Sequence, residues 1–119
     1  MYQAENTFIS STFWGERVGY SAALATIKEL KKTNAFKKVN TNGANIKTIW
    51  KKISKKHKVP IKIIGTNAIQ YFEFLTTHLM NKTYLTQEML KNNILASNMV
   101  YVNLVHNPKV TKKYESILD

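Results

Sequence analysis

Three hydroxyl side chains near the start of the chain, Ser10, Ser11 and Thr12, stand just before a stretch with helical spacing. Hydroxyl groups together with free backbone N–H groups at the start of a helix can bind an anion such as phosphate. Serine and threonine in this place also act as ordinary N-caps. The spacing alone therefore leaves two interpretations open, a phosphate-binding loop and a plain helix cap.

The sequence contains few other candidates for catalytic or metal-binding residues. The chain has no cysteine, so a disulfide framework, a thiolate metal site and a cysteine nucleophile are excluded. His57, His78 and His106 are far apart and have no carboxylate at metal-ligand spacing, so we do not expect a metal site. The acidic residues are too scattered to supply paired carboxylates or a Ser-His-Asp order. No catalytic residue is assigned.

The net charge of +11 raises the possibility of a polyanion partner. Twelve lysines lie between Lys28 and Lys62, where Glu29 is the only acid, and Arg17 is the only arginine of the chain. Specific nucleic-acid readers rely on arginine for bidentate contacts, whereas a lysine surface is commonly a solvated face. Binding to nucleic acid or another polyanion is therefore kept as the alternative, non-enzymatic function.

The 119 residues are enough for one domain, and 44% hydrophobic residues indicate a packed core. No apolar run approaches the roughly 18 residues of a membrane span, and no signal peptide is visible. A cytoplasmic location is the default expectation.

Two helices are expected in the first half, over residues 18–32 and 42–56, joined by a short basic connection at 35–39. Helical spacing predicts one buried face of the first helix, made of Ala23, Ile27 and Leu30. The inward positions of the second helix are Ile46, Ile49, Trp50, Ile53 and His57. Phe36 and Val39 of the connection are expected to dock on the core. A membrane-surface helix is the alternative for 42–56, but its apolar stripe is no wider than core packing needs.

Two strands should follow, over residues 61–64 and 69–75, and pair as an antiparallel hairpin. Residues 76–82 are polar and predicted to be irregular. A helix is predicted over residues 83–91, with Leu85, Met89 and Leu90 inward. It should end at Asn92 and Asn93, because asparagine tolerates the left-handed conformation.

The alternation over residues 99–105 predicts a half-buried strand. Asn107 and Pro108, a cap followed by proline, should begin a final helix whose buried face carries Val110, Tyr114 and Ile117. The order of elements predicts an α+β fold, a small antiparallel sheet with helices packed on it.

Several segments resemble class III pyridoxal-phosphate (PLP) aminotransferases, particularly the branch around glutamate-1-semialdehyde aminomutase. The first is residues 10–14, SSTFW, followed by Glu16, Arg17 and Gly19 and an Ala-Ala-Leu-Ala-Thr helix at 22–26. The others keep the family's order: TQEMLK at 86–91, then LASN at 95–98 with Tyr101 and Val102, then His106. The resemblance implies that residues 18–119 are the C-terminal small domain of a fold-type I PLP enzyme, and residues 1–17 a loop from the edge of the large domain.

The resemblance also implies a role for the hydroxyl loop. In the family, the threonine of this motif holds the cofactor phosphate of the neighbouring subunit in a homodimer. Carried over, Thr12 binds the phosphate of PLP and Ser11 supports it. Phe13 and Trp14 could line the cofactor pocket or belong to the core or interface, Arg17 could recognise a substrate carboxylate, and Glu16 could pair with Arg17.

The lysine that binds the cofactor, and the aspartate that pairs with its ring nitrogen, belong to the family's large domain, before the point where this chain begins. No lysine here occupies a matching position. Both ends look truncated, so we expect a C-terminal piece of a longer enzyme, inactive alone. The parent would act on an amino-acid or amino-aldehyde substrate by amino-group transfer or by intramolecular migration.

Overall fold

The computed structural model describes residues 15–119 of the chain. The chain divides into two compact units, Met1–Asn34 and Ala35–Asp119, and each is described by itself. The predicted boundary between a large-domain loop, residues 1–17, and a small domain, residues 18–119, refers to the complete enzyme and stays a prediction.

The described part of the first unit is one helix, α1 (Arg17–Lys32), which confirms the helix predicted over residues 18–32. Lys31 and Lys32 in its last turn complement the negative end of the helix dipole. The predicted buried face is wrong, because no residue of α1 is buried. Apolar spacing makes a face available for packing, but burial also requires a second element against that face.

The second unit begins with a long helix, α2 (Ala35–Lys56). The predicted connection at residues 35–39 is wrong, because these residues form the first turns of α2. Asn34, with φ of 51°, makes the left-handed turn that separates α1 from α2. The helical period places Ala35 and Val39 on the core side, whereas Phe36 falls off that stripe and is 71% exposed, so its predicted docking is wrong.

The sheet has three antiparallel strands in the order β1 (Ile61–Gly65), β2 (Ile69–Phe74) and β3 (Met99–Tyr101). The predicted hairpin is confirmed, with Ile63 opposite Phe72. The third strand is much shorter than predicted. After the Val102 N–H donates to the Ala68 carbonyl, the chain turns, and the Asn103 N–H donates to Nδ1 of His106.

The helix α3 (His78–Lys91) begins five residues earlier than predicted. The Asn81 side chain donates to the Thr76 carbonyl and the Thr77 hydroxyl, and these bonds hold the start of the helix in the segment expected to be irregular. Met89 is buried as predicted, but Leu90 is 58% exposed, which corrects its predicted inward position. The helix ends as predicted, with Asn93 at a φ of 58°.

The final helix is α4 (Pro108–Leu118). The predicted cap is confirmed: Oδ1 of Asn107 accepts hydrogen bonds from the N–H groups of Lys109 and Val110. Thr111 is the buried residue of this helix, whereas Val110 is exposed, contrary to its predicted burial.

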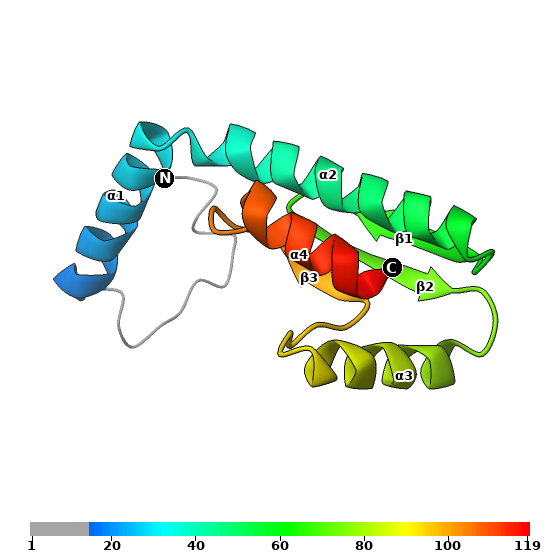
Figure 1. Ribbon diagram of the computed structural model, residues 1–119. Coiled ribbons are helices and arrows are strands. Elements are labelled where there is room, and N and C mark those ends of the chain that lie inside the picture. The colour runs from blue at the N-terminus through cyan, green and yellow to red at the C-terminus, as the bar shows by residue number, and fades with distance from the viewer. Residues whose placement is uncertain (1–14) are drawn as a thin grey trace, which may run out of the picture. The chain divides into compact units, whose positions relative to one another are not determined.

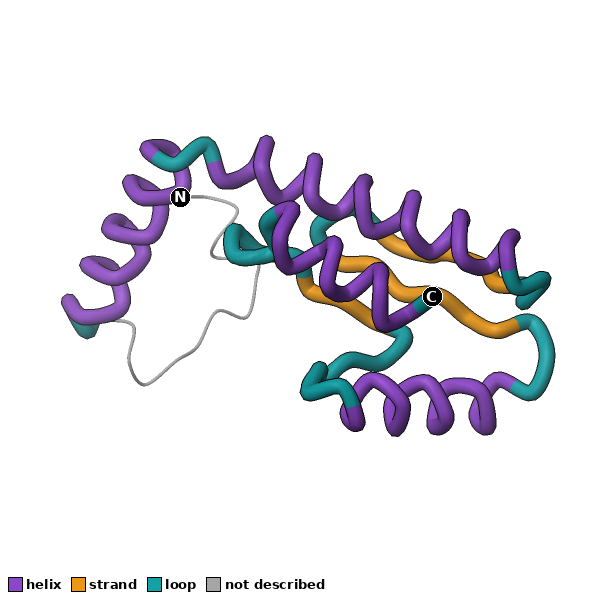
Figure 2. Tube along the Cα trace, viewed as in Figure 1, coloured by secondary structure: helices purple, strands orange, loops and turns teal. Residues whose placement is uncertain are grey.

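The core of the second unit lies between α2, α4 and one face of the sheet. Its buried residues are Ile46, Trp50, Phe72 and Val102, with Tyr114 and Leu118 of α4 packed against them. Figure 1 shows α2 running along the β1–β2 hairpin with α4 beside it, and the tube in Figure 2 separates helices from strands. The α+β fold class, a small antiparallel sheet with helices packed on it, is confirmed.

Candidate functional site

The predicted phosphate-binding residues, Ser11 and Thr12, lie outside the described residues, as do Phe13 and Trp14. The assignment of Thr12 and Ser11 to the cofactor phosphate stays a prediction. Glu16 and Arg17 are described. Glu16 is the N-cap residue of α1, and it makes neither a side-chain cap bond nor the expected ion pair with Arg17.

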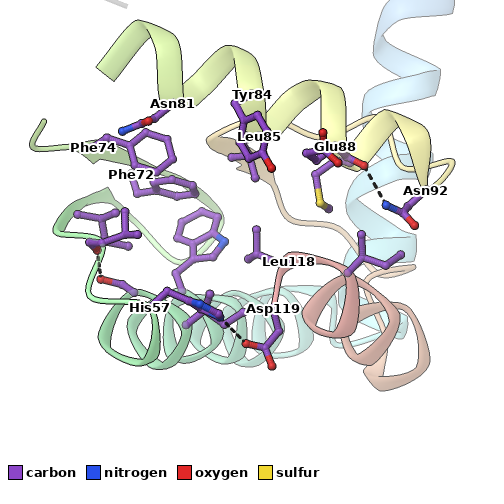
Figure 3. A pocket seen from close by; sticks show the side chains of 17 residues that line it. His57, Phe72, Phe74, Asn81, Tyr84, Leu85, Glu88, Asn92, Leu118 and Asp119 are labelled. Carbon is purple, nitrogen blue, oxygen red and sulfur yellow. Dashed lines mark hydrogen bonds and ion pairs between the residues drawn. The ribbon is translucent and has the colours of Figure 1, made fainter. Parts of the chain in front are cut away.

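Within the second unit the structure is hollowed by a cavity of about 600 Å³. Side chains from α2, β1, β2, α3 and α4 line it, and most of them are apolar (Figure 3). Three aromatic rings form an edge-to-face series in its wall. The centroids of Trp50 and Phe72 are 4.8 Å apart, and those of Phe72 and Phe74 are 5.2 Å apart. Edge-to-face contacts stabilise aromatic pairs beyond the effect of burying the rings, so these three rings favour a rigid wall.

A charged cluster lies at the rim of the cavity, where α2 meets the end of α4. The carboxylate of Asp119 accepts from Nζ of Lys56 at 2.6 Å. It also lies 2.9 Å from Nε2 of His57 (Figure 3). The hydrogen bond from Lys56, and then the one from His57, hold the pKa of Asp119 below its ordinary value. The prediction that His57 is an inward residue of α2 is wrong: its ring is 43% exposed and meets a carboxylate that is distant in the sequence.

The cavity offers binding surface without catalytic machinery. The Ser54 hydroxyl is the one serine group in its lining, and it donates to the Val59 carbonyl at 2.6 Å instead of to His57. Among residues 15–119, no three histidine, aspartate or glutamate side chains converge on a possible metal position. We therefore assign no reaction to this cavity.

The cavity does not fit the phosphate of PLP. A phosphate dianion needs cationic or N–H donors, whereas the lining contains no lysine or arginine and includes the carboxylates of Glu88 and Asp119. The start of α4 is also unsuited, because Asn107 already satisfies its first N–H groups. Within residues 15–119, neither the cavity nor the start of α4 therefore supplies the donors that a phosphate needs. The lining of the cavity suits an apolar group instead.

A clamp that the sequence did not predict joins α2 to the β1–β2 turn. The Asn67 side chain donates to Oδ1 of Asn40 at 2.8 Å, and Nζ of Lys47 donates to the Gly65 carbonyl at 3.0 Å. Between these bonds the turn lies against Gly43, where a side chain would overlap the Asn67 carbonyl. Glycine inside a helix is the sequence feature that could have indicated this close approach.

Buried Gln70 of β2 supports the same clamp. Its Nε2 donates to the Gly43 carbonyl at 2.9 Å, while its Oε1 is buried and has no partner. A fully buried glutamine is rare, and here it fixes the distance between the sheet and the middle of α2.

The arrangement of the elements is found as a part of a PLP-dependent enzyme. That enzyme is the FumI protein of Sphingopyxis sp. MTA144, solved in its PLP internal aldimine form, with a TM-score of 0.79 and 17% sequence identity. The match covers 97% of this chain but 28% of the FumI chain. The likeness shows a shared fold, and the chain spans little more than a quarter of the length of that enzyme.

No family model matches the sequence, and a search of curated proteins found no relative. Among residues 15–119, no helix is long and apolar enough to cross a membrane.

Proposed function

We propose that this chain serves as the C-terminal part of a class III PLP-dependent aminotransferase or aminomutase, similar to glutamate-1-semialdehyde aminomutase. The observation that carries the proposal is the shared fold with part of FumI over 97% of this chain. The SSTFW segment at residues 10–14 supports the finer assignment, because it resembles the phosphate-binding segment of that family.

In the proposed enzyme, the cofactor supplies the chemistry, and residues of this chain bind and position the cofactor. PLP, when bound, withdraws electrons from the carbon that carries the amino group. The hydroxyl and backbone N–H of Thr12 donate to the cofactor phosphate of the partner subunit in a homodimer, with Ser11 beside them. Residues 18–119 form the C-terminal small domain of this enzyme. Its substrate is an amino acid or amino aldehyde.

The test uses the proposed complete protein, in which this chain follows a large domain with the cofactor-binding lysine. Thr12→Ala removes the hydroxyl donor, so we expect faster loss of PLP during dialysis, followed by the visible absorbance of the bound cofactor. Thr12→Ser keeps the donor and should retain PLP like the parent. Thr26→Ala is the matched control, because the Thr26 hydroxyl bonds within α1, to the Ala22 carbonyl.

Retention of PLP by Thr12→Ala at the parental level would reject the phosphate-binding role. Absence of PLP from the complete protein would reject the proposed enzyme altogether. The 119-residue chain alone should neither retain PLP nor transfer an amino group, because the lysine that holds the cofactor belongs to the large domain in this proposal.

The alternative function is polyanion binding through the lysines. The salt dependence of nucleic-acid binding distinguishes it from the proposed function. Three lysines of α2 are already engaged: Lys52 with Glu115, Lys56 with Asp119, and Lys47 with the Gly65 carbonyl. We therefore expect no meaningful affinity for a fluorescent single-stranded DNA or RNA at physiological salt. Binding that weakens steeply as salt rises would favour the alternative instead.

A further inference from the structure

The sequence contains a single Asn-Gly pair, Asn42 and Gly43, and the pair lies inside α2. Asparagine followed by glycine is prone to spontaneous deamidation, because glycine has no Cβ to hinder attack by its backbone nitrogen on the asparagine side chain. Turns are the usual setting of such a pair. Here it belongs to a helix of 22 residues, so the fold decides whether the reaction can occur.

Deamidation of this pair takes two steps. The backbone nitrogen of Gly43 first bonds to Cγ of Asn42, the bond from Cγ to the side-chain nitrogen breaks, and ammonia leaves with the proton of the Gly43 N–H. Water then opens the five-membered imide at one of its two carbonyls. One opening gives aspartate, and the other gives isoaspartate, in which the main chain runs through Cβ. The ring closes only when rotation about the Asn42 Cα–C bond brings the Gly43 nitrogen to Cγ, away from the helical conformation.

Gly43 is held on three sides in the folded chain. It lies past the first four N–H groups of α2, so its N–H belongs to the hydrogen-bond ladder of the helix. Its carbonyl accepts from Nε2 of buried Gln70 at 2.9 Å. The Asn67 carbonyl occupies the space where a side chain of residue 43 would stand. The attacking nitrogen is therefore neither free nor able to turn toward Asn42.

The clamp between α2 and the β1–β2 turn holds the helix on both sides of the pair. Oδ1 of Asn40 accepts from the Asn67 side chain at 2.8 Å before the pair, and Nζ of Lys47 donates to the Gly65 carbonyl at 3.0 Å after it. Rotation within the pair would move one part of the helix relative to the other. Asn40 and Lys47 could then not both keep their partners in the turn, so the reaction requires the clamp to open.

We propose that Asn42 is a deamidation site that the clamp keeps dormant and that opening of the clamp releases. The modification is one-way, because isoaspartate adds an atom to the main chain where α2 touches the turn. Gly43 then no longer fits against both Gln70 and Asn67, and a chain that has opened is permanently prevented from closing. The site does not depend on the proposed enzyme activity.

Incubation of the full 119-residue chain at neutral pH, in buffer and in concentrated urea, tests the site. Peptide mass spectrometry measures the mass gain at residue 42 and distinguishes aspartate from isoaspartate. The reaction should be about a hundredfold slower in the folded chain, because it occurs only in the small open population. Asn42→Gln should remove the fast reaction in urea, since glutamine would have to form a larger ring.

Variants of the clamp test what protects the site. Asn40→Ala and Lys47→Met each remove one bond of the clamp, and each should raise the rate in the folded chain by about threefold. Asn45→Ala is the matched control, because Asn45 is exposed on the same helix, and it should leave the rate unchanged. Tyr114→Phe removes a bond between α2 and α4 outside the clamp, so it should raise the rate less than the clamp variants do.

Equal rates in the folded and the urea-unfolded chain would overturn the proposal, since the fold would then give no protection. Fast mass gain that persists in Asn42→Gln would overturn the assignment to residue 42. A larger effect of Tyr114→Phe than of the clamp variants would overturn the role of the clamp, because global unfolding would then be the event that exposes the site.

Discussion

The indole N–H of Trp50 donates a hydrogen bond to the hydroxyl of Tyr114 at 2.8 Å, and so joins α2 to α4 across 64 positions of sequence. Trp50 is buried in the core, and its ring packs edge-on against Phe72. The bond satisfies a buried donor that has little access to water, and it fixes the final helix over the sheet.

Tyr114→Phe should therefore destabilise the chain by about 1–3 kcal/mol, because a buried indole donor is left unsatisfied while the ring still packs. Urea unfolding followed by circular dichroism measures the loss. Tyr84→Phe is the matched control, since Tyr84 is exposed, and it should change the free energy of unfolding little. Equal effects of the two variants would contradict the role of the bond.

Burial raises the pKa of the Tyr114 hydroxyl above its ordinary value, more strongly than the bond from Trp50 lowers it. The folded state therefore favours the neutral phenol. This contribution to stability is fully present below pH of about 10 and is lost as pH rises through the higher folded pKa. The tyrosinate absorbance of Tyr114 should therefore appear above the ordinary pH range of a tyrosine in an alkaline titration, and Tyr114→Phe should remove this step.

Gly43→Ala should destabilise the chain, because the added methyl group would overlap the carbonyl oxygen of Asn67. Overpacking of this kind typically costs about 1–3 kcal/mol, and it opposes the gain of alanine over glycine in a helix. Gly19→Ala in α1 is the matched control, since open space surrounds that position. It should stabilise its helix slightly. Thermal unfolding of both variants provides the comparison.

Asp119→Asn should remove a pH-dependent part of the stability. The pKa of Asp119 is lowered in the folded state by Lys56 and His57, so its contribution is present above the ordinary value of about 3.9. It is lost as pH falls through the lower folded pKa. The variant should be less stable than wild type at neutral pH and equal to it in strong acid. Glu73→Gln is the control, and a similar pH profile for it would contradict the assignment.

The local features of this chain follow from its sequence. Asn107 followed by Pro108 predicts the start of α4, and Asn93 predicts the left-handed end of α3, because these preferences depend on a few neighbouring residues. The β1–β2 hairpin follows from two short apolar runs around a turn. The α+β fold class follows from the order of these elements.

Long-range contacts were decided by the tertiary structure. Three contacts join residues that no local sequence pattern relates. They are the pairing of Asp119 with His57, the Trp50–Tyr114 bond and the clamp at Gly43. Burial also depends on partners: spacing predicted a buried face on α1, but a face is buried only where another surface covers it. Helical and strand periods arise from the local backbone, whereas contacts and burial depend on the packing of the whole chain.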